Sequence, residues 1–232
     1  DAEYFVRTFI RGPVCRGQIA TDVIRDRFWA VFQDPDHDLY ITDPDYRAKV
    51  SDLMLVVDHP ANAEALAAAA AKAGKPLTVI VDIDPGIHRT GTASPEATVE
   101  LVQKVANFRS LTYAGVQFYC GSHQHIVDFK ERTAQIKERT EYLQGILAKL
   151  EEAGLKPGIV TGSGTGTHYI DAKLGVFTEL QVGSYVFMDH DYNVCDLRGL
   201  DKPTFEQALQ IDARVVSANT PGMVTVDAGL KA

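Results

Sequence analysis

From residue 53 onward, short apolar runs alternate with amphipathic stretches that have a helical period. The apolar runs predict buried strands at residues 53–58, 77–84, 111–119, 158–161 and 177–182. Three helices are expected between them, at residues 60–73, 94–108 and 126–153. Strands that alternate with helices indicate a parallel sheet with right-handed crossovers. We therefore predict an α/β fold over residues 53–205, in the form of a partial (βα) barrel or an open sheet.

The chain changes character at both ends. Residues 208–216 and 223–227 flank the turn sequence Asn219-Thr220-Pro221-Gly222, which predicts a β-hairpin. Residues 206–232 are therefore expected to be the start of a β domain. Residues 1–52 are rich in charges, lack this alternation, and are expected to form a separate segment. Because an open sheet exposes strand edges that favour association, we also expect a homodimer.

The composition narrows the range of partners. The net charge is −8 and the sequence pI is about 5.3, so neither nucleic acid nor an anionic membrane surface is an expected partner. No apolar run approaches the roughly 18 residues of a membrane span. The cysteines Cys15, Cys120 and Cys195 are far apart and form no Cys-x-x-Cys motif. This pattern indicates reduced thiols rather than disulfides or a zinc cluster, and we expect a cytoplasmic protein.

The loop after the second predicted strand contains the first candidate for ligand binding. Its sequence is Val81-Asp82-Ile83-Asp84-Pro85-Gly86-Ile87-His88-Arg89-Thr90-Gly91. The apolar run stops at Pro85-Gly86 and is followed by charged residues, which is typical of a buried strand that ends in a polar loop. Arg89 is the residue that we expect to meet a ligand, because its planar fork of donors suits an anionic oxygen.

Two glycine-containing loops follow the last two predicted strands. They are Thr161-Gly162-Ser163-Gly164-Thr165-Gly166-Thr167 and Gly183-Ser184-Tyr185. Glycines let backbone amides approach an anion closely, and the hydroxyl groups add further donors. Phosphate sites in barrels commonly follow the last strands. We therefore predict a phosphate cup between residues 162–165 and 183–184, with two flexible turns as the alternative.

Two further stretches at strand ends contain candidate residues. Tyr119 ends the third predicted strand, where it is placed to exchange a hydrogen bond with a ring nitrogen. His123 and His125, close behind it, are two residues apart, which suits neither a helical metal pair nor a closed zinc site. A structural role stays open for both histidines. The stretch after Gly183 is polar as far as Tyr192, which can reach back to the phosphate; the alternative is an exposed acidic turn.

Together these stretches resemble the D-threonine aldolase, D-3-hydroxyaspartate aldolase and D-serine dehydratase group of alanine-racemase-type barrels, over residues 53–232. The resemblance implies pyridoxal phosphate (PLP) as cofactor, a divalent metal, and lyase chemistry on a small D-3-hydroxy amino acid. It implies that Arg89 faces the phenolic oxygen of PLP, that Tyr119 lies beside the pyridine ring, and that the glycine loops hold the phosphate. The expected cofactor-binding residues are Arg89, Tyr119, Gly162, Gly164, Thr165, Gly183, Ser184 and Tyr192.

The sequence departs from this group in two ways. In the group, a lysine on the first barrel strand holds PLP as a Schiff base, within an Arg-Pro-His-x-Lys-Thr-His-Lys-like run that this sequence lacks. The one lysine before Leu53 is Lys49, which lies in a different sequence context. The His-x-Asp or His-x-Cys pair that binds the metal in the group is absent as well. We therefore expect an incomplete catalytic site and assign no catalytic residue and no metal ligand.

Residues 1–52 resemble a different family. The run Arg11-Gly12-Pro13-Val14-Cys15-Arg16-Gly17-Gln18, followed by Asp26-Arg27-Phe28-Trp29, is similar to part of the fatty acid cis/trans isomerases. The Cys-x-x-Cys-His haem attachment signal of that family is absent. Three functions stay open: a PLP-dependent lyase, a non-catalytic phosphate-ligand-binding or interaction module, and a fragment of a lipid isomerase.

Overall fold

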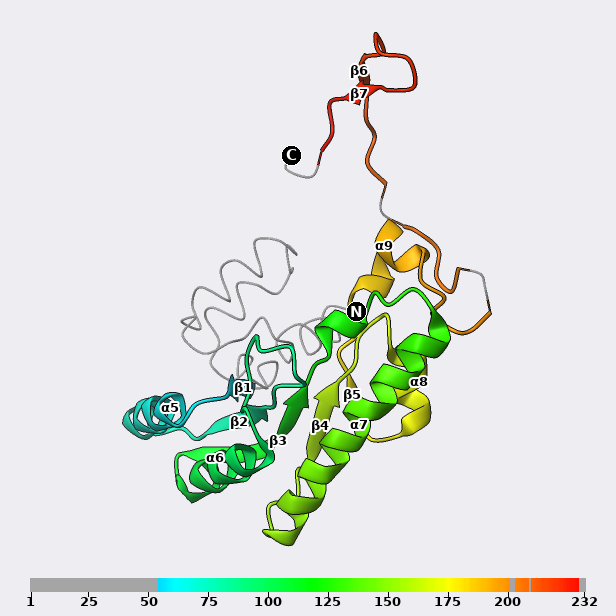
Figure 1. Ribbon diagram of the computed structural model, residues 1–232. Helices are drawn as coiled ribbons and strands as arrows, with labels where there is room; N and C mark the ends of the chain where they lie inside the picture. Colours follow the sequence, from blue (N-terminus) through cyan, green and yellow to red (C-terminus); the bar gives the residue numbers. More distant parts are fainter. Residues whose placement is uncertain (1–53, 201–202, 209, 230–232) are drawn as a thin grey trace.

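Five parallel strands form the central sheet (Figure 1). The computed structural model describes residues 54–200, 203–208 and 210–229. The strands lie side by side in sequence order, as β1 (Met54–Val57), β2 (Leu77–Asp82), β3 (Leu111–Phe118), β4 (Ile159–Gly162) and β5 (Glu179–Leu180). A barrel segment has this order, whereas a doubly wound sheet reverses its strand order at a switch point. The predicted α/β fold with a partial barrel is confirmed, and these five strands form an open sheet.

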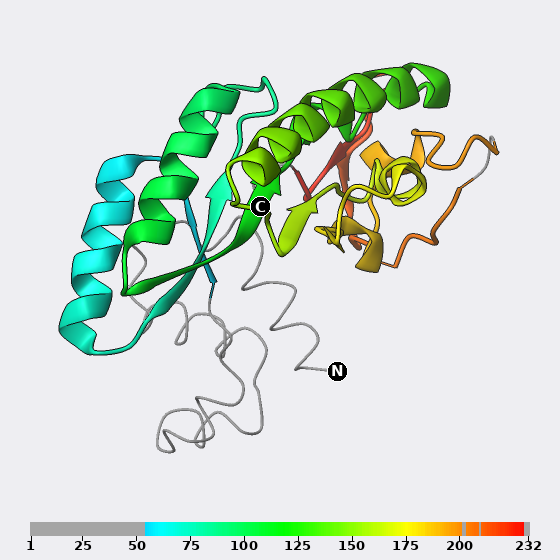
Figure 2. The ribbon, with the colours of Figure 1, turned by 90° about the horizontal axis from the view of Figure 1, so that it is seen from below.

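Helices α5 (Pro60–Ala73), α6 (Pro95–Asn107) and α7 (Phe129–Glu152) lie along one face of the sheet, as Figure 2 shows from below. Local signals set their ends. Gly74 ends α5 with a φ of 68°, a left-handed conformation that glycine adopts without strain. Asp128 caps α7 by accepting a hydrogen bond from the Glu131 amide at 2.7 Å. For that reason α7 begins at Phe129 and not at the predicted residue 126.

The N-terminus of α6 depends on the Ser94 hydroxyl, which accepts a hydrogen bond from the Ala97 amide at 3.1 Å. Ser94→Ala should lower the free energy of unfolding by about 1 kcal/mol, because this amide loses its acceptor. Chemical denaturation measures the change. Ser94→Asp is the control, since aspartate keeps an acceptor at the cap. Equal stability of wild type and Ser94→Ala would contradict the prediction.

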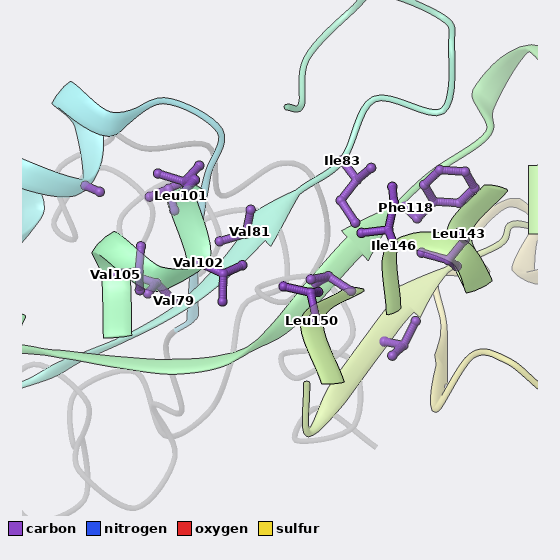
Figure 3. Close-up of a cluster of buried hydrophobic side chains, with 14 of the residues drawn as sticks. Val79, Val81, Ile83, Leu101, Val102, Val105, Phe118, Leu143, Ile146 and Leu150 are labelled. Carbon is purple, nitrogen blue, oxygen red and sulfur yellow. The ribbon is translucent and has the colours of Figure 1, made fainter. Parts of the chain in front are cut away.

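The hydrophobic core lies between the sheet and helices α6 and α7 (Figure 3). Alternate residues of the strands point into it, because successive side chains of a strand face opposite sides. The helices contribute residues three or four positions apart, which share one helical face. The residues labelled in Figure 3 are all at most 2 % exposed: Val79, Val81, Ile83, Leu101, Val102, Val105, Phe118, Leu143, Ile146 and Leu150. This packing fixes the strand ends from which the loops of the site emerge.

The register of β2 against β3 shifts at one point. Val79 pairs with Tyr113, whereas the next residue, Ile80, pairs with Gly115. Ala114 is therefore an extra residue, which makes a β-bulge in β3. β3 also runs very close to β4 here, because a Cβ on Gly115 would lie 1.9 Å from a carbonyl oxygen of Ile159. The bulge sets the register of β3 against β2, and the glycine allows the close approach of β3 to β4.

The opposite face of the sheet is polar near the strand ends. Gln117 donates to Asp82 at 3.0 Å, and Gln181 donates to Gln117 at 3.2 Å and to Thr161 at 3.1 Å. Thr161 in turn donates to Glu179 at 3.1 Å. Buried polar groups are stable when they are hydrogen-bonded in this way. The series links the carboxyl ends of β2 to β5 directly beneath the loops.

Several short elements follow strand ends where no regular structure is predicted. They are η2 (Gly121–His123), α8 (His168–Leu174), η3 (Ser184–Val186) and α9 (His190–Asn193). β5 is shorter than the predicted strand at residues 177–182. The predicted hairpin is present, with shorter strands than expected, β6 (Val215–Ser217) and β7 (Thr225–Val226). It stands away from the sheet in Figure 1.

Some predictions concern parts or properties that the fold does not test. The segment 1–52, with Cys15 and Lys49, lies outside the described residues. The domain boundaries after residues 52 and 205 and the homodimer stay predictions. Within residues 54–200, 203–208 and 210–229, no helix has the length and apolar character needed to cross a membrane.

Candidate functional site

The carboxylate of Asp84 organises the loop after β2. Its Oδ1 accepts hydrogen bonds from the amides of Gly86, Ile87 and His88 at 2.9, 3.0 and 3.0 Å. Its Oδ2 pairs with Nδ1 of the exposed His88 at 2.7 Å. Burial acts to raise the pKa of Asp84, but the hydrogen bonds from His88 and Gly86 outweigh it, so this pKa lies below its ordinary value. The ionised carboxylate therefore holds the turn closed at neutral pH.

The far end of the same loop returns to the sheet. The Gly91 amide donates to Oδ2 of Asp58 at 3.1 Å, and Thr92 forms a parallel bridge with the residue after β2. Gly91 has a φ of 106°, and a Cβ there would lie 2.3 Å from the Asp84 nitrogen. Glycine is therefore required at this position. Between these two attachments the loop presents Arg89 with an exposed side chain.

Arg89 and Tyr119 come together across the ends of β2 and β3. The Arg89 guanidinium lies over the Tyr119 ring, 5.6 Å from its centroid, within the range of a cation–π contact. Burial raises the pKa of Tyr119, and the positive charge of Arg89 lowers it by a smaller amount. The phenol is therefore protonated at neutral pH and can donate a hydrogen bond.

The glycine loop after β4 is tightly packed. A Cβ on Gly162 would lie 2.1 Å from the Phe118 carbonyl oxygen, and one on Gly164 would lie 2.5 Å from Oε1 of Gln124. A Cβ on Gly166 would lie 1.9 Å from the Gln124 carbonyl oxygen. Packing against main-chain atoms therefore requires glycine at Gly162 and Gly166, and a Cβ on Gly164 would displace the buried Gln124 amide. The sequence interpretation, that glycines here let an anion approach, is not needed to explain Gly162 and Gly164, and their role at a cofactor stays a prediction.

The two glycine loops meet at Thr165. Its Oγ1 accepts a hydrogen bond from the Tyr185 amide at 3.1 Å. In the described part of the chain, the amides of Thr165, Gly183 and Ser184 donate to no backbone carbonyl. A Cβ on Gly183 would meet no atom within 4 Å, so that side of the second loop is open. The loops that the sequence predicts to form one cup are thus in contact.

Tyr192 completes this group from the short helix α9. Oδ1 of Asp189 accepts a hydrogen bond from the Tyr192 amide at 2.9 Å and so caps the helix. The Tyr192 ring is buried and lies 4.3 Å from the ring of His125. Burial raises the pKa of Tyr192, a hydrogen bond with the Ser184 side chain lowers it, and the neighbouring Tyr119 raises it. The alternative of an exposed acidic turn is therefore wrong for Tyr192.

These contacts join residues that are far apart in the sequence. Arg89 lies over Tyr119, Tyr119 neighbours Tyr192, and Tyr192 bonds to Ser184. The residue after Ser184 donates in turn to Thr165. The structure thus brings together residues from all four strand-end stretches that the sequence singles out. Sequence reasoning missed Gln124, on which the glycine loop packs, and Asp84, which shapes the loop that bears Arg89.

Cys120, Lys104 and Lys149 are poorly suited to act as nucleophiles in the site. Burial raises the pKa of the Cys120 thiol to about 12, so it is not a thiolate at neutral pH. Burial also lowers the pKa of His123, with the charge of Arg139 adding to the effect. Lys104 and Lys149 form ion pairs on the outer surfaces of helices. Among the described residues, no three His, Cys, Asp or Glu side chains are grouped as a metal site requires.

Comparison with known families agrees with this architecture. The family profile for the alanine racemase N-terminal domain matches residues 39–191, and the chain belongs to that family. The profile for fatty acid cis/trans isomerase (CTI) matches residues 1–74. Both predicted resemblances are confirmed. The two matches overlap at residues 39–74, beyond the predicted boundary at residue 52.

Within this family, the chain is similar to aldolases. It is 40 % identical over 179 residues to 3-hydroxy-D-aspartate aldolase of Paracoccus denitrificans (strain Pd 1222), which covers 76 % of this chain and 46 % of the relative. It is 35 % identical over 184 residues to D-threonine aldolase of Arthrobacter sp, over 79 % of this chain and 48 % of the relative. The chain thus spans about half the length of the curated relatives it matches.

Comparison with solved structures also finds an aldolase and a protein with the alanine racemase fold. The crystal structure of D-threonine aldolase from Filomicrobium marinum matches with a TM-score of 0.71 and 35 % identity, over 78 % of this chain and 48 % of that one. Alanine racemase of Clostridium difficile 630 in complex with cycloserine matches with a TM-score of 0.54 and 19 % identity, over 67 % of this chain and 40 % of that one. The second match shows a shared fold.

Proposed function

We propose that this protein binds pyridoxal phosphate, with the phosphate group in the cup formed by residues 162–165 and 183–184. The observation that carries the proposal is the 3.1 Å hydrogen bond from the Tyr185 amide to Thr165, because it joins the two loops. A phosphate group needs several donors that converge on it. The amides of Thr165, Gly183 and Ser184 donate to no backbone carbonyl of the described residues and are therefore available to an anion, and the open side of Gly183 leaves room for it.

The remaining residues of the group fit the rest of the cofactor. Arg89 is an exposed fork of donors for the phenolic oxygen, and the protonated Tyr119 is a donor beside it. The Tyr192 phenol lies close to the Ser184 side chain, at the edge of the cup. When bound, PLP supplies an electron sink for bond cleavage next to an amino group. The chain's own residues bind and orient it.

The similarity to aldolases supports the choice of reaction. We infer lyase chemistry on a small D-3-hydroxy amino acid, either carbon–carbon cleavage or dehydration. The described residues offer a cup for the phosphate, and Arg89 offers a contact for the phenolic oxygen. Among these residues we assign no lysine to the cofactor and no ligand to a metal. We therefore propose that this chain, tested by itself, binds PLP reversibly without cleaving substrate. A cytoplasmic location stays a prediction from the cysteine pattern.

The test is a titration of the chain with PLP, followed by borohydride reduction, peptide mapping and an assay of D-threonine cleavage. We expect saturable binding that inorganic phosphate displaces, without stoichiometric labelling of one lysine. The described lysines Lys104 and Lys149, for example, are held in ion pairs with Glu64 and Glu96 on helix surfaces. A single lysine adduct together with cleavage would contradict the proposed lack of activity, and absence of binding would contradict the cup.

A non-catalytic phosphate-ligand-binding module is the second candidate, because the same cup serves any phosphorylated ligand. The two candidate functions differ in whether Arg89 contributes to binding of the ligand. A module that recognises phosphate alone binds inorganic phosphate and PLP with similar affinity. A PLP protein binds PLP more tightly, and the difference depends on Arg89.

A further inference from the structure

The side chain of Gln124 lies at the centre of the polar contacts beneath the glycine loop after β4. It is 1 % exposed. Its Oε1 accepts a hydrogen bond from the Gly166 amide at 2.9 Å, and its Nε2 donates to Oγ1 of Thr167 at 3.1 Å and to the Cys120 carbonyl at 3.2 Å. Both donor protons and the acceptor of the amide are thus in use.

The loop packs against both the side chain and the main chain of Gln124. A Cβ on Gly164 would lie 2.5 Å from the side-chain oxygen of Gln124, and one on Gly166 would lie 1.9 Å from its main-chain carbonyl oxygen. Thr165 lies between these two glycines and accepts the hydrogen bond from the second loop. The position of Gln124 therefore determines where Thr165 lies, and through Thr165 where the second loop lies.

The opposite side of the loop is held by α8. Thr167 is fully buried, shares a 3.3 Å hydrogen bond with Ser163, and bonds to the Asp171 side chain. Burial raises the pKa of Asp171, while its hydrogen bonds with Thr167 and Ser163 lower it by less. Thr167 is shared between this group and Gln124. Gln124 thus connects the loop, through Cys120, to the end of β3.

We propose that Gln124 is a positioning residue that sets the conformation of residues 162–167 and thereby the affinity of the cup for a phosphate group. The inference rests on the proposed function of the cup. Gln124 acts through the Gly166 amide and the Thr167 hydroxyl, and not by contact with the ligand. The proposal therefore predicts two effects of substituting Gln124 that can be measured separately. One is on the stability of the loop conformation, and the other is on the affinity for phosphate.

The first test is Gln124→Met, which keeps the length of the side chain and removes its hydrogen bonds. The dissociation constants for inorganic phosphate and for PLP should rise about tenfold, because the loop loses buried hydrogen bonds that fix it. Hydrogen exchange of the Gly166 amide should accelerate, while amides in α7 keep their protection. Gln103→Met is the matched control, because Gln103 is exposed on α6; it should change neither quantity.

The second test is Gln124→Glu, which gives a readout that a merely structural role would not change. A buried carboxyl group has a raised pKa. When protonated, it accepts from Gly166 and donates to Thr167, as the amide does, and lacks only the bond to the Cys120 carbonyl. When ionised, it lacks both donors and repels the anion. The ratio of variant to wild-type dissociation constants, measured at each pH, should therefore fall towards one as the pH is lowered.

The outcomes are distinct. Wild-type affinity in Gln124→Met, or a ratio for Gln124→Glu that does not change with pH, overturns the inference. If Gln124→Met fails to fold, as thermal unfolding would reveal, the Gln124→Glu ratio decides. If the wild-type chain binds neither phosphate nor PLP, the proposed function fails, and the exchange rate of the Gly166 amide alone decides whether Gln124 holds the loop.

Discussion

Gly183→Val should weaken the binding of both PLP and inorganic phosphate about 100-fold while the protein stays folded. A Cβ at Gly183 would meet no atom within 4 Å, and φ is −135°, so the chain itself does not require glycine there. The space that a valine side chain would fill is the space that we assign to the phosphate. A hydrogen bond to a charged group contributes about 1.5–3 kcal/mol, and losing one or two accounts for the expected loss.

Isothermal titration calorimetry measures the affinities, and thermal unfolding measures the fold. Gly145→Val is the matched control, because Gly145 lies in α7 and a Cβ there would also meet no atom within 4 Å. It should leave both affinities unchanged. Binding by Gly183→Val that equals the wild type would show that no anion occupies this side of the second loop.

Arg89→Met should weaken PLP binding about 10- to 100-fold and leave the binding of inorganic phosphate unchanged. The reason is that Arg89 is assigned to the phenolic oxygen of the cofactor and not to its phosphate. One charge-assisted hydrogen bond contributes about 1.5–3 kcal/mol, which corresponds to this range. The absorbance of bound PLP should also shift, because the positive charge that stabilises the ionised phenolic oxygen is removed.

The control for this variant is Arg109→Met. Arg109 is exposed and lies just before β3, at the amino end of the strand. It carries the same charge but lies at the opposite edge of the sheet from the loops. If Arg89→Met weakens phosphate and PLP equally, then Arg89 acts on the phosphate through its charge, and its assignment to the phenolic oxygen is wrong.

The elements that the sequence predicts best are those with strong local signals. The bounds of α5 agree with the prediction because Pro60 begins the helix and Gly74 ends it. α8 has seven residues and α9 has four, too few for a helical period to stand out from a polar loop. The apolar run at residues 177–182 predicts a longer strand than β5, because such a run does not tell how much of it pairs with its neighbour.

For the candidate site, a different factor limits what can be predicted from the sequence. Arg89 and Tyr119 are predicted because Arg89 lies in the loop after one strand pattern and Tyr119 ends the next, and parallel strands present their ends at one edge. Nothing in the sequence distinguishes a glycine that lets a ligand approach from one that avoids a buried side chain. At Gly164 the missing Cβ makes room for Gln124, and its role at a cofactor stays a prediction. Gln124 itself has no local pattern, since its two contacts with the loop, at Gly166 and Thr167, lie more than forty residues away in the sequence.

The bulge at Ala114 decides which way each later side chain of β3 faces. Side chains alternate along a strand, so one extra residue exchanges inside and outside for everything that follows. With the bulge, Val116 lies opposite Val81 and faces the helices, while Gln117 lies opposite Asp82 and faces the polar side. Without the bulge, Gln117 would face the helices and Val116 the polar side. The side-chain amide of Gln117 would then lie among aliphatic side chains. The orientation of the end of β3 thus depends on Ala114, one residue that has no pairing partner in β2.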